Sequence, residues 1–374
     1  MLTHLAGPYV VGIDAGGTKT RCVVLTLGGA LAGTGTGPGA NPNSGGDTAG
    51  ALTTALREAL GDVDRSHVLT GVFGIAGAGS AGRPAAVAGA RSAWHAVGLR
   101  GSPAVVTDIA VAFAAGTSAP KGIVVFSGTG AGAAVINDGT IVQRADGYGW
   151  LVGDEGSAVW LGREAVRAAL AAYDGRGSPT LLTESVPRAL LGGSAVRNQE
   201  PSARRPRHHR ALALAGAPSL ASGGAQGGGG TGTALLVADD PSGEPAHHPR
   251  PGPPPNPQLA QAIIKEVYGR PPAALGRLGP VVAAAAASGD PVARRITEEA
   301  AEWLLRDVDA VRPALSDPYA PVVMHGSVLR DGPVADAVRS GLSERFGAAP
   351  RRAGDGAIGA AGLALRRLGF PLPD

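Results

Sequence analysis

Apolar and polar residues alternate along the first third of the chain in a pattern that predicts a mixed sheet. Short apolar runs between Gly- and Thr-rich turns predict strands, and longer runs with apolar residues every three or four positions predict helices. The predicted strands are residues 9–13, 21–27, 31–36, 68–75 and 104–107, and the predicted helices are residues 49–60 and 83–97. Three strands followed by alternating helices and strands predict a sheet covered by helices.

The middle of the chain repeats this opening. Apolar strands are predicted at residues 122–127 and 133–136, and a turn at 137–139 leads into a further strand. A helix is predicted at residues 154–173. Two units of the same architecture, each with a glycine turn after its first strand, favour a nucleotide bound between them.

The composition changes abruptly near residue 192. From there to about residue 257 the chain is rich in Gly, Pro, Ser, Ala, Arg and His, which predicts a disordered insertion because such a segment buries too little apolar surface to fold. Beyond it we expect helices at 258–268 and 298–311, with a third helix through the alanine tract between them, then a strand at 322–324 and a closing helix at 356–368.

Length and composition narrow the class of protein. A chain of 374 residues favours two domains. A net charge of +3 gives little support to nucleic-acid binding, and Cys22, the only cysteine, excludes a disulfide framework and a zinc site of several thiolates. With no signal peptide and no apolar run of membrane-spanning length, we expect a cytoplasmic protein that binds neither nucleic acid nor a membrane.

The strongest motif is DAGGTKT at residues 14–20, directly after a predicted strand. Adjacent glycines let the backbone approach a phosphate, hydroxyl groups and a lysine add donors and charge, and Asp14 is suited to hold hydrated Mg²⁺. An ordinary hairpin turn would not require a carboxylate before the glycines or a lysine after them. We assign phosphate binding to Gly16, Gly17, Thr18, Lys19 and Thr20.

A second glycine turn, SGTG at residues 127–130, also follows a predicted strand. It offers the same chemistry from the second unit, so the two turns are suited to hold the β- and γ-phosphates from opposite sides. We assign phosphate binding to Ser127, Gly128, Thr129 and Gly130.

Asp108 lies at the end of a predicted strand, between the two turns in sequence. This position suits a general base that takes the proton from an attacking hydroxyl group. Asp is also a preferred helix N-cap, and the local sequence leaves the two interpretations even. Its place between the phosphate turns favours catalysis.

The loop GYGWLVGDEGS at residues 147–157 is suited to bind a sugar. Its acids and exposed amides match several hydroxyl groups, and Tyr148 or Trp150 can stack on an apolar sugar face. Acids also favour a helix N-terminus, but capping does not explain so many glycines. Asn41 and Asn43 are further candidates, although asparagine is also a routine turn residue. The assigned sugar-binding residues are Asn41, Asn43, Asp108, Gly147, Gly149, Asp154 and Glu155.

Together with HGSVL at 325–329 and DGAIGAAGLAL at 355–365, these motifs resemble the BadF/BadG/BcrA/BcrD ATPase family, and within it the N-acetylglucosamine kinase branch. The resemblance covers all but the insertion. It implies an α/β fold of two ribonuclease-H-like domains of the actin, Hsp70 and sugar kinase superfamily facing an ATP cleft. Residues 1–118 and 356–374 would form one lobe, and residues 119–355 the other.

The resemblance also implies roles for single residues. Asp14 would hold Mg²⁺ through water, Thr18 and Thr129 would bind ATP phosphates, and Asp108 would be the base acting on the sugar 6-hydroxyl. Gly326 and Ser327 would lie near adenosine, with His325 at the border of the adenine site. The substrates would be ATP and an amino sugar, and we expect a homodimer.

Where N-acetylglucosamine kinases are expected to carry an aromatic residue or His near the sugar-loop Asn, this chain has Pro42 and Asn43. Polar surroundings with Asp154 and Glu155 favour a free amine over an acetamide, so we expect glucosamine. The alternatives are an N-acetylglucosamine kinase, a broader hexose or amino-sugar kinase, and a nucleotide-sensing module or sugar-independent ATPase. An activator of 2-hydroxyacyl-CoA dehydratases would need a pair of cysteines for its iron–sulfur cluster.

Overall fold

The structure is a computed structural model that describes residues 7–79, 81–192 and 257–370. The predicted disordered insertion lies outside the described residues, apart from Gly192 and Pro257 at its ends. In the part of the chain that the structure covers, no helix is both long and apolar enough to cross a membrane.

The first sheet has five strands in the order β3-β2-β1-β4-β5. The first three strands pair antiparallel, and β4 and β5 join in parallel. Their bounds are Tyr9–Ala15 (β1), Lys19–Thr26 (β2), Leu31–Pro38 (β3), Val68–Ile75 (β4) and Ala104–Thr107 (β5). The sheet is mixed, as predicted.

The second sheet repeats this topology, with β8-β7-β6-β9-β10 in place of β3-β2-β1-β4-β5. Again three antiparallel strands are followed by two parallel ones. The strands are Lys121–Ser127 (β6), Ala131–Asn137 (β7), Thr140–Asp146 (β8), Val322–His325 (β9) and Arg351–Arg352 (β10). The predicted internal repeat is therefore confirmed.

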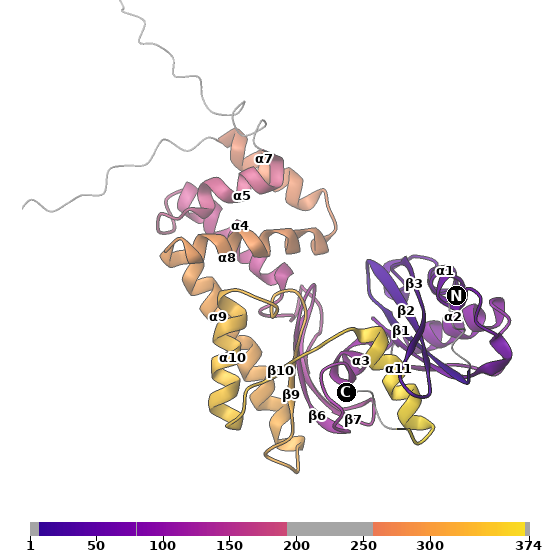
Figure 1. The fold of residues 1–374 in the computed structure, drawn as a ribbon. Helices are drawn as coiled ribbons and strands as arrows, with labels where there is room; N and C mark the ends of the chain where they lie inside the picture. The colour runs from indigo at the N-terminus through magenta and orange to yellow at the C-terminus, as the bar shows by residue number, and fades with distance from the viewer. Residues whose placement is uncertain (1–6, 80, 193–256, 371–374) are drawn as a thin grey trace, which may run out of the picture.

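Two helices, α1 (Thr48–Leu60) and α2 (Arg83–Ala96), cover the outer face of the first sheet (Figure 1). Helix α1 lies directly on β3, where glycine occupies every second position: Gly33, Gly35 and Gly37. A Cβ atom at any of the three would overlap or crowd a carbonyl oxygen of α1. The glycines recur at every second residue because these residues share one face of the strand, and α1 approaches that face closely.

The two sheets are joined by α3 (Asp108–Ala114) and α11 (Gly356–Arg367), which lie between them (Figure 1). Both helices belong to one buried cluster that also contains Val10 and Val72 of the first sheet and Val124 and Val323 of the second. The end of the chain thus returns to pack against its beginning. The first residue of α3 is Asp108, and the residue that caps α11 is Asp355.

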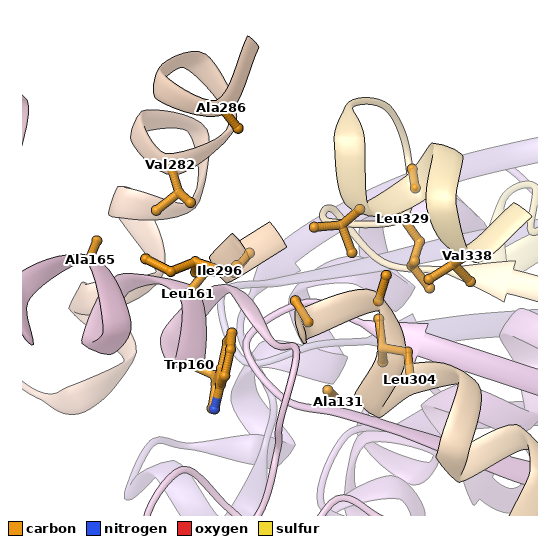
Figure 2. Close-up of a cluster of buried hydrophobic side chains, with 14 of the residues drawn as sticks. Ala131, Trp160, Leu161, Ala165, Val282, Ala286, Ile296, Leu304, Leu329 and Val338 are labelled. Atoms are coloured by element: carbon orange, nitrogen blue, oxygen red, sulfur yellow. The ribbon is translucent and has the colours of Figure 1, made fainter. Parts of the chain in front are cut away.

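The remaining helices cover the outer face of the second sheet and extend beyond it (Figure 1). They are α4 (Ala158–Tyr173), α5 (Leu182–Leu191), α7 (Pro257–Tyr268), α8 (Gly279–Ala287), α9 (Pro291–Val311) and α10 (Pro333–Phe346). Short 3₁₀ segments occur at Pro42–Ser44, Arg65–His67, Pro272–Leu278 and Arg312–Ala314. Figure 2 shows side chains of α4, α8, α9 and α10 meeting in this core, among them Leu161, Val282, Leu304 and Val338.

Two predicted helix boundaries were wrong. The helix predicted from residue 154 begins at Ala158, because Asp154 and Gly156 both have positive φ and Ser157 is the N-cap, with its Oγ accepting the Trp160 N–H at 3.1 Å. The helix predicted from residue 298 begins at Pro291, where the Asp290 side chain caps it. The sequence analysis also missed α5, α10 and β10.

Candidate active site

The first phosphate turn connects β1 to β2 and is closed by a 2.9 Å hydrogen bond from the Gly16 N–H to the Lys19 carbonyl. Gly17, Thr18 and Lys19 are exposed at its tip. A Cβ atom at Gly17 would meet nothing within 4 Å, so the backbone there is open to a ligand. The turn therefore has the exposed amides and the cation that phosphate oxygens require.

The second phosphate turn connects β6 to β7. Thr129 is exposed at its tip, and a Cβ atom at Gly128 would meet nothing within 4 Å. Gly326, at the end of β9, packs against the Ser127 carbonyl, which also accepts the Val328 N–H at 3.1 Å. The structure therefore brings the predicted adenosine-side residues next to the second phosphate turn.

Two of the predicted phosphate ligands have hydroxyl groups that are already engaged. Thr20 is 1% exposed and its Oγ1 donates to the Pro38 carbonyl at 2.7 Å. Ser127 is 0% exposed and its Oγ donates to the Gly156 carbonyl at 2.8 Å. These hydroxyls hold neighbouring segments in place, and phosphate binding at Thr20 and Ser127 stays a prediction.

Asp108 is the first residue of α3, immediately after β5. The N-cap of this helix is Thr107, whose side chain makes no capping hydrogen bond, so Asp108 is not the N-cap. The Thr107 Oγ1 atom is buried and has no hydrogen-bond partner among the described residues. A buried hydroxyl without a partner is costly, so this position suits a ligand or a water molecule that supplies the missing hydrogen bond.

Two residues of the second sheet, Arg144 and His325, lie near enough to Asp108 to interact with its charge. Burial raises the pKa of Asp108, while the nearby His325 and Arg144 and the Ile109 N–H act to lower it. Burial lowers the pKa of His325, and Asp108 opposes that shift. His325 therefore lies close enough to Asp108 to interact with its charge, an arrangement that the expected position beside adenine did not include.

Asp14 stands at the end of β1, facing a group of acids. Burial and the charges of Asp108 and Asp355 raise the pKa of Asp14 to about 6, with Lys19 acting in the opposite direction. Asp355 caps α11 by accepting the Ala357 N–H at 2.9 Å and forms a 2.8 Å ion pair with Arg21. Crowded carboxyls favour a proton or a cation, so Asp14 fits the Mg²⁺ role that the resemblance implies.

The candidate sugar residues occupy two places. Asn41 caps the 3₁₀ segment Pro42–Ser44 by accepting the Asn43 N–H at 2.9 Å, and both side chains lie against Gly77. Asp154 is 8% exposed, and its Oδ1 accepts the Ala131 N–H at 3.2 Å, beside the second phosphate turn. Burial raises the pKa of Asp154, and that hydrogen bond counteracts the shift.

The loop between β8 and α4 presents an apolar tip to solvent. Tyr148, Leu151 and Val152 are each 72% exposed, and Trp150 is 43% exposed. Gly149, with φ of 102°, has open space around its Cα. The two aromatic residues expected to stack on a sugar are therefore accessible, and so is the backbone between them.

The sequence analysis missed Asp307, an acid of α9. Its Oδ2 atom is buried without a hydrogen-bond partner in the described ranges of the chain. Burial, together with the charges of Asp146 and Glu155, raises the pKa of Asp307 to about 7. Burial and a hydrogen bond with Asp146 also raise the pKa of Glu155. Asp307 lies far from Asp146 and Glu155 in the sequence, and no sequence pattern links them. They become neighbours only because α9 packs against β8 in the fold.

The raised pKa of Asp307 predicts a loss of stability as the pH rises. Because the folded state holds this proton up to about pH 7 and the unfolded chain releases it near 3.8, the free energy of unfolding falls between those values. Asp307→Asn is expected to lessen the fall measured by urea unfolding at about pH 5 and pH 8. Glu302→Gln, on the exposed side of the same helix, is the control. An equal fall in wild type and Asp307→Asn would contradict the prediction.

A duplicated five-stranded sheet, with a glycine turn after the first strand of each copy, defines a two-part α/β protein. The chain belongs to the BadF/BadG/BcrA/BcrD ATPase family, whose model matches residues 11–364. The family expected from the motifs is thus confirmed.

Among curated relatives, the N-acetylmuramic acid/N-acetylglucosamine kinase of Clostridium acetobutylicum is 34% identical over 176 residues, which cover 46% of this chain and 57% of the relative. The match therefore spans little more than half of the relative's length. Solved structures of candidate N-acetylglucosamine kinases from Chromobacterium violaceum (23% identity, TM-score 0.59) and Porphyromonas gingivalis (18%, TM-score 0.62) share the fold; each comparison covers 96% of this chain and 99% of the other.

Proposed function

We propose that this protein transfers the γ-phosphoryl group of ATP to the 6-hydroxyl of an amino sugar, with glucosamine as the preferred acceptor. The observation that carries the proposal is the environment of the Asp108 carboxyl group. Burial raises the pKa of this carboxyl, which interacts with Asp14 at the end of β1 and with His325 at the end of β9. Such a group is suited to accept a proton from a bound hydroxyl.

In the proposed reaction the sugar 6-oxygen attacks the γ-phosphorus while its proton passes to a carboxylate oxygen of Asp108. The bond between the γ-phosphorus and the β,γ-bridging oxygen breaks, and ADP leaves with that electron pair. The N–H group at Gly17 and the exposed Thr129, with Lys19, would stabilise negative charge on the phosphates. Because phosphoryl transfer depends mainly on positioning and charge, these groups suffice without a covalent intermediate.

Asp14 would hold Mg²⁺, through water in the mode that the resemblance implies. The ion, when bound with ATP, supplies positive charge that neutralises the phosphates. The fit rests on the crowding of Asp14, Asp108 and Asp355, which a cation would relieve.

The preference for glucosamine rests on the acids around the sugar loop. Asp146, Asp154, Glu155 and Asp307 gather near its end, where burial raises the pKa values of the last three and the Asp146 charge adds to each shift. A protonated sugar amine would be stabilised in this field, whereas an acetamide would gain little from it.

The test is ADP release, coupled to a spectrophotometric assay, with ATP and Mg²⁺ and each of glucosamine, N-acetylglucosamine, glucose and mannosamine. We expect the highest kcat/KM for glucosamine, with its advantage over N-acetylglucosamine at least about tenfold, the effect of one differential charged contact. A preference for N-acetylglucosamine would be consistent with a sugar kinase but would contradict the proposed preference for a free amine. Sugar-independent ADP release would contradict the kinase.

The second candidate is an N-acetylglucosamine kinase, favoured by the name of the Clostridium acetobutylicum relative and the partial match to it. The division into one lobe of residues 1–118 and 356–374 and another of residues 119–355 is proposed along with the function. The homodimer stays a prediction.

A further inference from the structure

Asp146, the last residue of β8, lies immediately before the predicted sugar loop. It is 9% exposed and has φ of 56°, a conformation that costs most side chains free energy and that Asp tolerates better than most. Its Oδ1 accepts the N–H groups of Asp154 at 2.9 Å and Tyr148 at 3.3 Å, and its Oδ2 accepts that of Glu155 at 3.0 Å. One carboxylate thus ties the two ends of the loop together.

Two arginines hold the same loop from outside. Arg144 donates through Nε to the Asp146 carbonyl at 2.8 Å and through Nη2 to the Gly147 carbonyl. Arg163 of α4 donates to the Trp150 carbonyl at 3.1 Å. Guanidinium groups therefore hold carbonyls of the loop, and the Asp146 carboxylate holds the amides at its two ends. Between these ends the Gly149 N–H donates to the Asp154 carboxylate, and a Cβ atom at Gly149 would meet nothing within 4 Å.

The second phosphate turn has hydrogen bonds of its own that do not involve Asp146. The Gly128 N–H donates to Gly130, the Ala158 N–H donates to Gly128, and Ser127 donates to Gly156. Loss of the Asp146 carboxylate would release the loop that follows β8 while these contacts keep the turn in place.

We propose that Asp146 is a positioning residue for the sugar: its carboxylate fixes the loop of residues 147–155 in the shape that binds the acceptor, ahead of binding. The inference rests on the proposed function. It concerns the sugar side of the site and not the ATP side, because the amides that the carboxylate orders belong to the loop. A preordered loop spares the sugar the entropy cost of ordering it.

The variants Asp146→Gly and Asp146→Asn separate the carboxylate from the backbone. Glycine adopts positive φ freely, so its effect reports the lost carboxylate. Asparagine keeps an oxygen that can accept from Tyr148 and Asp154, but its amide nitrogen cannot accept the Glu155 N–H. Asp138→Gly is the matched control, because Asp138 also has positive φ (47°) and lies in the turn between β7 and β8. There the Asp138 Oδ1 atom is 3.7 Å from the Nη1 atom of Arg366.

For Asp146→Gly we expect the KM for the sugar to rise at least about tenfold while the KM for ATP changes less than about threefold, with Asp146→Asn in between and Asp138→Gly unchanged. Hydrogen exchange followed by mass spectrometry on a peptide spanning residues 146–156 should be faster in Asp146→Gly than in wild type and unchanged in Asp138→Gly.

Parallel rises in both KM values, or faster loop exchange with an unchanged sugar KM, would overturn the proposal. If the wild-type protein phosphorylates no amino sugar, the proposed function fails by itself. The hydrogen-exchange experiment then tests only whether the Asp146 carboxylate orders the loop. Faster exchange in Asp146→Gly supports that role, and unchanged exchange overturns it.

Discussion

Asp108→Asn is expected to lower kcat for sugar-dependent ADP release by roughly 10² to 10⁴ while leaving the affinity for ATP nearly unchanged. The amide is close in size to the carboxylate but cannot accept the proton of the attacking hydroxyl. Because the carboxyl is buried with a raised pKa, its replacement by a neutral group should not destabilise the fold. Steady-state kinetics and calorimetric titration with ATP measure the two effects separately.

Asp355→Asn is the matched control for charge. The Asp355 and Asp108 carboxylates both act on Asp14, but Asp355 pairs with Arg21 and caps α11, a role that Asn also performs well. We expect the Asp355→Asn variant to keep most of the wild-type kcat. Turnover near the wild-type value in Asp108→Asn would remove Asp108 from the base role, and equal losses in both variants would assign the effect to the charge around Asp14.

Gly326→Ala is expected to weaken ATP binding at least about tenfold, or 1.4 kcal/mol. An alanine Cβ at this position would overlap the Ser127 carbonyl and come within 3.0 Å of the Gly128 nitrogen. Either the end of β9 or the second phosphate turn must then move. Overpacking of this kind costs about 1–3 kcal/mol, and here the cost falls on the second phosphate turn. The KM and Kd for ATP are the measurements.

The control for backbone strain is Gly332→Ala. Gly332 has φ of 98°, close to the 104° of Gly326, but a Cβ atom there would meet nothing within 4 Å. Both variants should lose thermal stability through strain at positive φ, Gly326→Ala more because of the added overlap, and only Gly326→Ala should lose ATP affinity. If both variants bind ATP equally well, contact between Gly326 and the second phosphate turn has no part in nucleotide binding.

The sequence predicted the strands well because their signals are local. Apolar runs between glycine turns identified β1 to β9, and the repeat of that order predicted a second sheet with the topology of the first. The glycine at every second position of β3 was readable as a pattern, but its cause, the backbone of α1 lying on the strand, is a tertiary contact.

Side-chain direction was harder to predict than side-chain type. Thr20 and Ser127 both stand beside glycine turns, yet the strands carrying them turn their hydroxyls toward Pro38 and Gly156. Asp146 escaped notice because the motif was taken to begin at Gly147, and its role depends on the chain folding back to bring Asp154 beside it. His325 and Asp355 meet Asp108 and Asp14 only across the fold.

Identification of the reaction product tests the central claim most directly. Wild-type protein would be incubated with ATP, Mg²⁺ and glucosamine, and the product analysed by phosphorus–proton correlation NMR. The account predicts a phosphomonoester on the 6-oxygen of the sugar, formed in equal amount with ADP, and none with the 6-deoxy sugar. ADP formed at the same rate without sugar, or with no phosphorylated sugar, would contradict it.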